Sequence, residues 1–189
     1  MSEIAVPDDR DCEMIDGKII MMARPSLNHS TIAANIWKIF STFLKGKTCK
    51  AYLEPDVFLD ENNNFIPDVL IVCDRDKRKG NGIYGAPDLA VEVLSPSTAK
   101  KDLGEKKNIY EKYGVREYWT VDPDSKAISV FHLRNGSFAL DNLYFYRTAE
   151  EQAKMTEDDR NALTAHFKTS LFDGLIIHLE EIFEDIESF

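Results

Sequence analysis

The chain has 189 residues and a formal net charge of −10; 43% of its residues are hydrophobic and 30% are charged. This size and composition predict a single globular domain over residues 1–189 and exclude an intrinsically disordered chain. The acidic, proline-interrupted amino terminus does not resemble a signal peptide, and no apolar run is long enough to span a bilayer, so we expect a cytoplasmic protein without a membrane partner.

The three cysteines, Cys12, Cys49 and Cys73, do not have the spacing of a metal site. Cys49 and Cys73 lie in apolar segments typical of β-strands, where a cysteine is usually a buried free thiol. We therefore expect free thiols at these two positions, as in a reducing cytoplasm.

The first half of the chain predicts a hairpin, a helix and three strands. Residues 13–22 alternate in polarity around Asp16-Gly17, a strong hairpin turn signal. Residues 28–44 carry apolar side chains at helical spacing, and Ser26 is placed to cap that helix. We expect strands at 49–59, 66–73 and 89–94, a polar turn at 60–64, and an exposed, mobile loop at 74–87.

The second half predicts a further helix and several more strands. A helix is expected from Ser97 or Thr98 through about Tyr113, where Gly114 ends it. Strands at 117–121, 127–133 and 137–146 should follow, then a helix at 150–167, a strand at 175–179 and a short acidic helix. These elements together predict an α/β fold with a mixed central β-sheet flanked by helices.

Two acidic residues interrupt apolar strand segments. Asp68 follows Pro67 at the head of a strand, where a turn aspartate bonded to backbone N–H groups is the simpler interpretation. Glu92 lies in a segment that is apolar on both faces, so it needs a metal, a shifted pKa or a structural salt bridge. On neighbouring strands the two carboxylates would share a hard cation such as Mg²⁺ or Mn²⁺, and the main-chain carbonyl of Val93 would supply another ligand.

A lysine on the following helix completes the candidate site. Most charges on this helix are expected to face solvent, and the i,i+4 spacing of Asp102 and Lys106 favours a simple surface pair. However, Lys106 falls on the core face, between Leu103 and Ile109, whereas Lys107 is rotated away. The functional alternative is that Lys106 stabilises charge on a scissile phosphate.

Two further polar residues stand at the ends of elements near this site. Glu13 begins the hairpin, and His29 begins the first helix, where it would orient a water or contact a phosphate. Taken alone, each is better explained as a structural or exposed residue.

The net charge opposes a nucleic acid partner, because phosphate contacts need basic groups. The charge is nevertheless uneven: residues 75–107 contain eight Lys or Arg and five Asp or Glu, a local excess of +3. The acidic excess lies mostly away from the candidate site.

These residues resemble a bacterial restriction endonuclease family of the PD-(D/E)XK superfamily. The likeness covers roughly residues 12–147 and 175–183, and it is carried by Pro67-Asp68, segment 85–98, Asp102, Glu105-Lys106, Tyr110, segment 114–119 and Asp122-Pro123. It implies a restriction-endonuclease-like core in which Asp68 and Glu92 bind metal and Glu13 matches an extra amino-terminal acid. It also implies that Lys106 replaces the motif lysine, which usually lies two residues after the second acid, where this chain has Leu94.

The leading hypothesis is a Mg²⁺- or Mn²⁺-dependent endonuclease that hydrolyses DNA phosphodiester bonds and acts as a homodimer, as nucleases of this fold often do. Its catalytic set is Asp68, Glu92, Lys106, Glu13 and His29, and its metal ligands are Asp68, Glu92 and Val93. Two alternatives stay open: a catalytically silent binding or assembly module, favoured by the acidity and Leu94, and a small-molecule phosphodiesterase, which an acidic surface suits.

Overall fold

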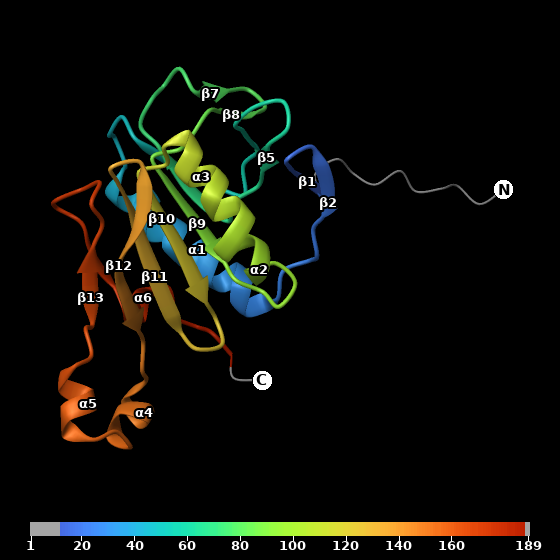
Figure 1. The fold of residues 1–189 in the computed structure, drawn as a ribbon. Helices are drawn as coiled ribbons and strands as arrows, with labels where there is room; N and C mark the ends of the chain where they lie inside the picture. Colours follow the sequence, from blue (N-terminus) through green and yellow to red (C-terminus); the bar gives the residue numbers. More distant parts are fainter. Residues whose placement is uncertain (1–11, 188–189) are drawn as a thin grey trace.

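The computed structural model describes residues 12–187 and is built around a mixed six-stranded sheet (Figure 1). Only β9 and β10 pair in parallel, and every other neighbouring pair in this sheet is antiparallel. The mixed central sheet expected from the sequence is therefore confirmed. In spatial order its strands are β12 (Ser137–Phe145), β11 (Ala127–Arg134), β10 (Glu117–Asp122), β9 (Leu89–Val93), β6 (Val69–Val72) and β3 (Lys50–Leu53).

Helices cover both faces of this sheet (Figure 1). Helix α1 (Leu27–Phe43) packs on one face, and Ser26 caps it as expected by accepting a hydrogen bond from the His29 amide. The other face is covered by a continuous helical segment that ends at Gly114, whose positive φ matches its predicted role. The helical segment consists of α2 (Ala99–Lys101), the π-helical turn η2 (Asp102–Lys106) and α3 (Lys107–Tyr113).

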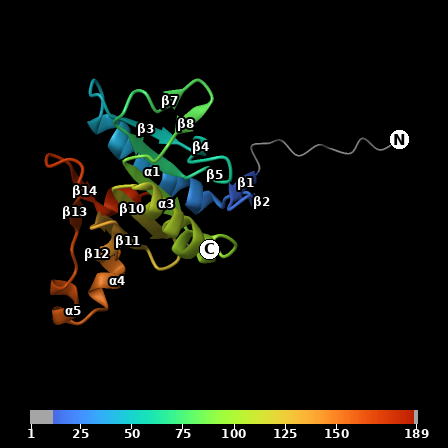
Figure 2. The same ribbon diagram turned by 45° about the horizontal axis from the view of Figure 1, so that its top comes forward.

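A second sheet lies beside the first and contains the predicted amino-terminal hairpin (Figure 2). The single strand expected at 49–59 is wrong, because Glu54 adopts a positive φ and Pro55 cannot donate to a ladder. The chain therefore leaves the central sheet after β3 and enters the second sheet as β4. This second sheet contains β2 (Lys18–Met21), β1 (Cys12–Ile15), β5 (Asn64–Phe65), β4 (Val57–Phe58), β8 (Gly82–Tyr84) and β7 (Arg78–Lys79).

Residues 74–87, expected to be an exposed mobile loop, instead contain the β7–β8 hairpin. Ile83 is buried, and its amide donates to the carbonyl of Asp56. Gly82 has a φ of +151°, and a Cβ at this residue would lie 2.7 Å from the same carbonyl oxygen. The close approach of the two segments explains both the order of this hairpin and the glycine.

The carboxyl-terminal region departs from the single helix expected at 150–167. It forms α4 (Ala149–Ala153) and α5 (Glu157–Asn161), because Thr148 and Thr156 each cap a separate helix with the side-chain oxygen. Strand β13 (His166–Lys168) follows and pairs with β14 (Ile176–His178), which confirms the strand expected at 175–179. The described chain closes with α6 (Leu179–Ile182) beside α1.

The prediction of free thiols at Cys49 and Cys73 is wrong, because the two residues form a disulfide. Lys50 pairs with Val72 at the end of the β3–β6 ladder, so the next residues outward on the two strands are these cysteines. The prediction of a reducing cytoplasm was based on these free thiols, so the disulfide removes the argument for it. Among residues 12–187, no helix combines the length and apolar character needed to cross a membrane.

Candidate active site

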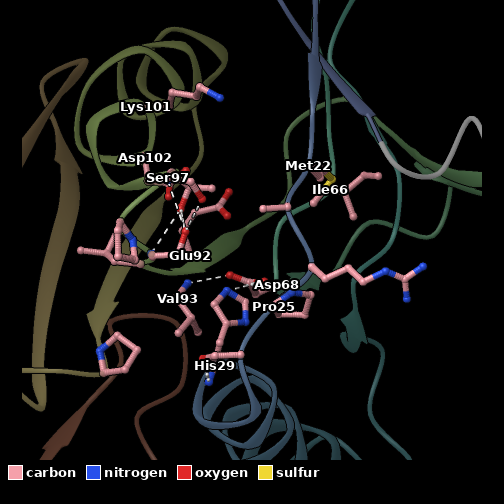
Figure 3. Close-up of a pocket in the computed structure, with 18 of the residues that line it drawn as sticks. Met22, Pro25, His29, Ile66, Asp68, Glu92, Val93, Ser97, Lys101 and Asp102 are labelled. Atoms are coloured by element: carbon pink, nitrogen blue, oxygen red, sulfur yellow. Dashed lines mark hydrogen bonds and ion pairs between the residues drawn. The ribbon is translucent and has the colours of Figure 1, made fainter. Parts of the chain in front are cut away.

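Strand register brings the two predicted acids together. Val69 on β6 pairs with Val91 on β9 in an antiparallel ladder, so the next position outward sets Asp68 opposite Glu92. The connection is direct, since the amide of Val93 donates to Asp68 Oδ2 at 2.6 Å (Figure 3). The neighbouring-strand arrangement that a shared cation requires is therefore present.

Lys106 reaches this strand end from the helical layer and is buried, with a relative exposure of 3%. Its Nζ lies 2.7 Å from Glu92 Oε1 and 2.8 Å from Glu13 Oε1. Glu13 comes from β1 in the second sheet, and its Oε1 also accepts a hydrogen bond from the Ile66 amide at 2.8 Å. Lys106 thus joins both sheets and the helical layer at one point.

The π-helical turn η2 changes which residues beside Lys106 face the core. One extra residue in the turn shifts the buried face relative to an ideal α-helix. Leu103, expected in the core, is 50% exposed, whereas Asp102 is buried with its Oδ1 3.7 Å from Lys106 Nζ. The interpretation of Asp102 and Lys106 as a surface pair is therefore wrong, and Asp102 joins the candidate site although the α-helical period had placed it outside.

His29 approaches the same acids from the first turn of α1. Its Nε2 lies 3.4 Å from Asp68 Oδ1, and in Figure 3 the ring faces Asp68 and the Val93 backbone. Burial lowers the pKa of His29, and a hydrogen bond with the Val93 backbone offsets part of this effect. The lowered pKa favours the neutral imidazole, which makes His29 a polar neighbour of Asp68 rather than a fixed positive charge.

Tyr110 is a second residue that the sequence did not assign to the site. Its hydroxyl donates to Glu92 Oε1 at 3.0 Å from a fully buried position on α3. In the sequence Tyr110 belonged to the family likeness, but its place on the apolar helix face favoured a core residue over a partner for Glu92. Glu92 therefore has two partners on the helical segment, an ammonium and a phenol.

The cluster contains four carboxyl groups and one ammonium, those of Glu13, Asp68, Glu92, Asp102 and Lys106. Burial raises the pKa of Asp68 to about 7, although the Val93 amide and the charge of Lys106 oppose the rise. Burial also raises the pKa of Glu92 well above its usual value and that of Asp102 above its own. Burial lowers the pKa of Lys106, but the charges of the surrounding carboxylates outweigh this and raise it overall.

Six side chains of the cluster line a cavity of about 510 Å³. The segment before α1 and the loop after β9 also contribute to its lining. The six are Glu13, His29, Asp68, Glu92, Asp102 and Lys106. If all four carboxyls were ionised, the single ammonium would leave an excess of three negative charges. Such a site lowers its electrostatic energy by taking up a cation.

The donor set fits a hard divalent cation. Within residues 12–187, no three His, Cys, Asp or Glu side chains are arranged to hold a metal on their own. Asp68 and Glu92 supply two oxygen-bearing side chains, and Mg²⁺ commonly takes only one or two carboxylates while keeping several waters. Leu94, at the usual position of the motif lysine, lines the cavity without a charge, and the ammonium of Lys106 arrives from the helix instead.

Comparisons with known proteins agree with this architecture. A model of the Uma2 family, described as "Putative restriction endonuclease", matches residues 2–156. The solved structure of a "putative nuclease belonging to DUF820" from Anabaena variabilis has a TM-score of 0.70 at 22% identity and covers 94% of this chain and 93% of that chain. This similarity shows a shared fold.

Two uncharacterized proteins of Synechocystis are similar in sequence. One is 34% identical over 124 residues, which are 64% of this chain, and the other is 27% identical over 115 residues, which are 58% of this chain. Each match spans 65% of the relative's length, slightly less than two thirds. Since the family model matches well over half of the sequence, the chain belongs to the Uma2 family, whose members are described as putative restriction endonucleases.

Proposed function

We propose that this protein is a Mg²⁺- or Mn²⁺-dependent endonuclease that hydrolyses DNA phosphodiester bonds. The observation that carries the proposal is the convergence of Asp68, Glu92 and Lys106 in one cavity, with two acids on adjacent strand ends and a buried ammonium 2.7 Å from one of them. Two acids and a lysine at the end of a mixed sheet supply the groups that phosphodiester hydrolysis needs.

In this proposal Asp68, Glu92 and the Val93 carbonyl hold the cation. When bound, the cation supplies Lewis acidity and lowers the pKa of its water. Lys106, which lines the cavity, stabilises negative charge on the scissile phosphate. Glu13 fixes Lys106 at 2.8 Å, and His29 supports Asp68 from 3.4 Å, so these two residues orient the groups that touch substrate and cation.

The charge imbalance of the cluster supports a cation site. The raised pKa of Asp68 and of Glu92 indicates that their ionised forms are under-compensated by Lys106 alone. A divalent cation bound through Asp68 Oδ1, which the His29 ring also approaches at 3.4 Å, would supply positive charge and leave the hydrogen bond from Val93 to Oδ2 in place.

The test is cleavage of plasmid and of single-stranded, duplex and branched DNA in Mg²⁺ or Mn²⁺. Asp68→Asn, Glu92→Gln and Lys106→Met should each abolish metal-dependent cleavage. Glu105→Gln and Lys107→Met are matched controls, because both residues neighbour Lys106 on the helix while Glu105 is exposed and Lys107 contacts the Phe131 ring. Cleavage that survives all three site substitutions would refute the assignment.

A small-molecule phosphodiesterase is the second candidate, and the cavity volume of about 510 Å³ favours it because small-molecule sites commonly measure about 300 to 1,000 Å³. Hydrolysis of a chromogenic phosphodiester, with no cleavage of any DNA, would select it. Calorimetry with Mn²⁺ tests the third alternative, a silent binding or assembly module. If the protein is such a module, it should show no Mn²⁺ binding that depends on Asp68 and Glu92.

A cytoplasmic location and a homodimer belong to the same proposal. A homodimer would present two such cavities to the two strands of a duplex. Light scattering at several protein concentrations measures the oligomeric state, and a monomer throughout would remove this part of the proposal.

A further inference from the structure

A second cavity, of about 260 Å³, is lined by basic side chains. Lys47 lies between α1 and β3, and Lys50 begins β3; Arg75 lies just before β7, and Arg78 begins β7. Gly46 and Thr48 complete the lining, which contains no acidic residue. We call this the basic pocket.

The basic pocket stands out against the acidity of the chain. Residues 45–50 contain three lysines and no acid, and residues 74–79 contain four basic and two acidic residues, a combined excess of +5 in a chain of net charge −10. Within the part of the chain that the structure describes, the cationic groups of Lys50, Arg75 and Arg78 form no ion pair or hydrogen bond. Lys47 lies over the Phe43 ring at 3.1 Å.

The end of α1 explains only part of this arrangement. Lysines after a helix carboxyl terminus interact favourably with the helix dipole, which accounts for Lys47. Arg75 and Arg78 belong to a different segment, and they add like charge to the same cavity without a carboxylate to balance it. Unbalanced cations that converge on a concave site create a strong positive potential, which favours an anion.

The disulfide holds the two sides of the basic pocket together. Cys49 lies between Thr48 and Lys50, and Cys73 lies two residues before Arg75, so the bond joins the two segments that supply the cations. A site fixed before its ligand arrives loses less conformational entropy on binding.

The basic pocket and the candidate active site lie at opposite ends of the same strand pair. Asp68 precedes β6, whereas Lys50 pairs with Val72 at the far end of that strand. In Figure 2 the segment after α1 lies on the side of the molecule opposite the β1–β2 hairpin. At about 3.3 Å per residue, the path from Asp68 to Cys73 spans roughly 17 Å, which is the axial rise of about five base pairs of duplex DNA.

We propose that the basic pocket binds a phosphate of the DNA backbone about five base pairs from the position at which the active site cuts. This inference rests on the proposed function for its substrate. Its chemistry needs only a phosphodiester backbone, since arginine and lysine contact phosphate oxygens without reading sequence. The pocket thereby gives an acidic protein a local surface for an anionic substrate.

The experiment measures binding of a labelled 20-base-pair duplex by fluorescence anisotropy in EDTA, so that no cleavage is needed. Arg75→Ala/Arg78→Ala is compared with Lys154→Ala/Lys168→Ala, which removes the same charge from exposed positions elsewhere. Each lost phosphate contact should weaken binding about eightfold at 0.1 M salt and reduce the salt slope by about 0.9. Because the proposed pocket holds one phosphate, we expect a loss of about eightfold for the pocket variant and less than threefold for the control.

Equal affinities of the two double variants would overturn the proposal, as would a wild type that fails to bind duplex in EDTA at low salt. A parallel titration with inorganic phosphate distinguishes a free-anion site: stoichiometric phosphate binding that Arg75→Ala/Arg78→Ala abolishes, with no effect on DNA binding, also overturns it. The proposed function is judged separately, by metal-dependent cleavage that requires Asp68.

Discussion

Replacing Lys106 by methionine removes the one ammonium that the structure places among the buried acids of the site. Methionine keeps a similar length and volume, so the change mainly deletes charge. The substitution leaves Glu92, Glu13 and Asp102 without the cation that lies 2.7, 2.8 and 3.7 Å from them. We expect a large loss of stability at neutral pH.

The magnitude follows from these distances. With an effective dielectric constant near 20, each pair contributes about 4 to 6 kcal/mol of attraction before the cost of desolvation is counted. Measured losses on removing one partner of a buried ion pair are about 3 to 5 kcal/mol, because the remaining charges become uncompensated. We expect this range for Lys106→Met at pH 8, and less than about 1 kcal/mol for Lys107→Met, which deletes a charge stacked on the Phe131 ring.

The loss should depend on pH in a defined direction. Burial raises the pKa of Asp68 and Glu92 in the folded state, so the folded protein binds more protons than the unfolded chain between pH 4 and 7. Stability therefore falls as pH rises through that window, and it should fall more steeply once Lys106 is gone.

Urea denaturation at pH 5 and pH 8, with and without Mg²⁺, measures the free energies of unfolding. We expect the deficit of Lys106→Met to shrink at pH 5 and to be partly restored by Mg²⁺ at pH 8. A variant as stable as the wild type at pH 8 would refute the electrostatic account of the cluster.

Three further predictions follow from single contacts. Mn²⁺ affinity measured by calorimetry should rise about tenfold from pH 6 to pH 8, because Asp68, with its pKa near 7, must lose its proton to bind a cation; a flat profile would contradict this. Tyr110→Phe should lower the free energy of unfolding by about 1 kcal/mol through the lost hydrogen bond to Glu92, and an unchanged melting temperature would exclude that contact. Reduction of the Cys49–Cys73 disulfide, which closes a segment of 24 residues, should cost about 3 kcal/mol in urea denaturation, whereas Cys12→Ser should leave the effect of reductant intact.

The sequence singled out the strand-borne residues that converge in the candidate site because their signals are local. An acid inside an apolar strand is anomalous wherever the strand lies, so Asp68 and Glu92 were found without knowledge of the fold. The register that sets them opposite each other depends on the pairing of β6 with β9, which no local pattern encodes.

The helical part of the site was predicted less completely. The 3.6-residue period selected Lys106 over Lys107, but it also placed Leu103 in the core and Asp102 on the surface. The π-helical turn reverses these two assignments, and a single sequence carries no signal for an extra residue in one turn. The disulfide was missed for a related reason. Cys49 and Cys73 come together because Lys50 pairs with Val72, and this long-range pairing is not encoded in either segment alone.

The central claim is that Asp68 and Glu92 hold a divalent cation that acts with Lys106 on a DNA phosphodiester. The most direct measurement compares cleavage of supercoiled and duplex DNA by the wild type, Asp68→Asn and the control Glu105→Gln in Mg²⁺, Mn²⁺ and EDTA. Cleavage by the wild type and Glu105→Gln in metal alone, with none by Asp68→Asn, is the predicted result. Absence of cleavage by the wild type on every substrate, or cleavage that persists in Asp68→Asn or in EDTA, would contradict the claim.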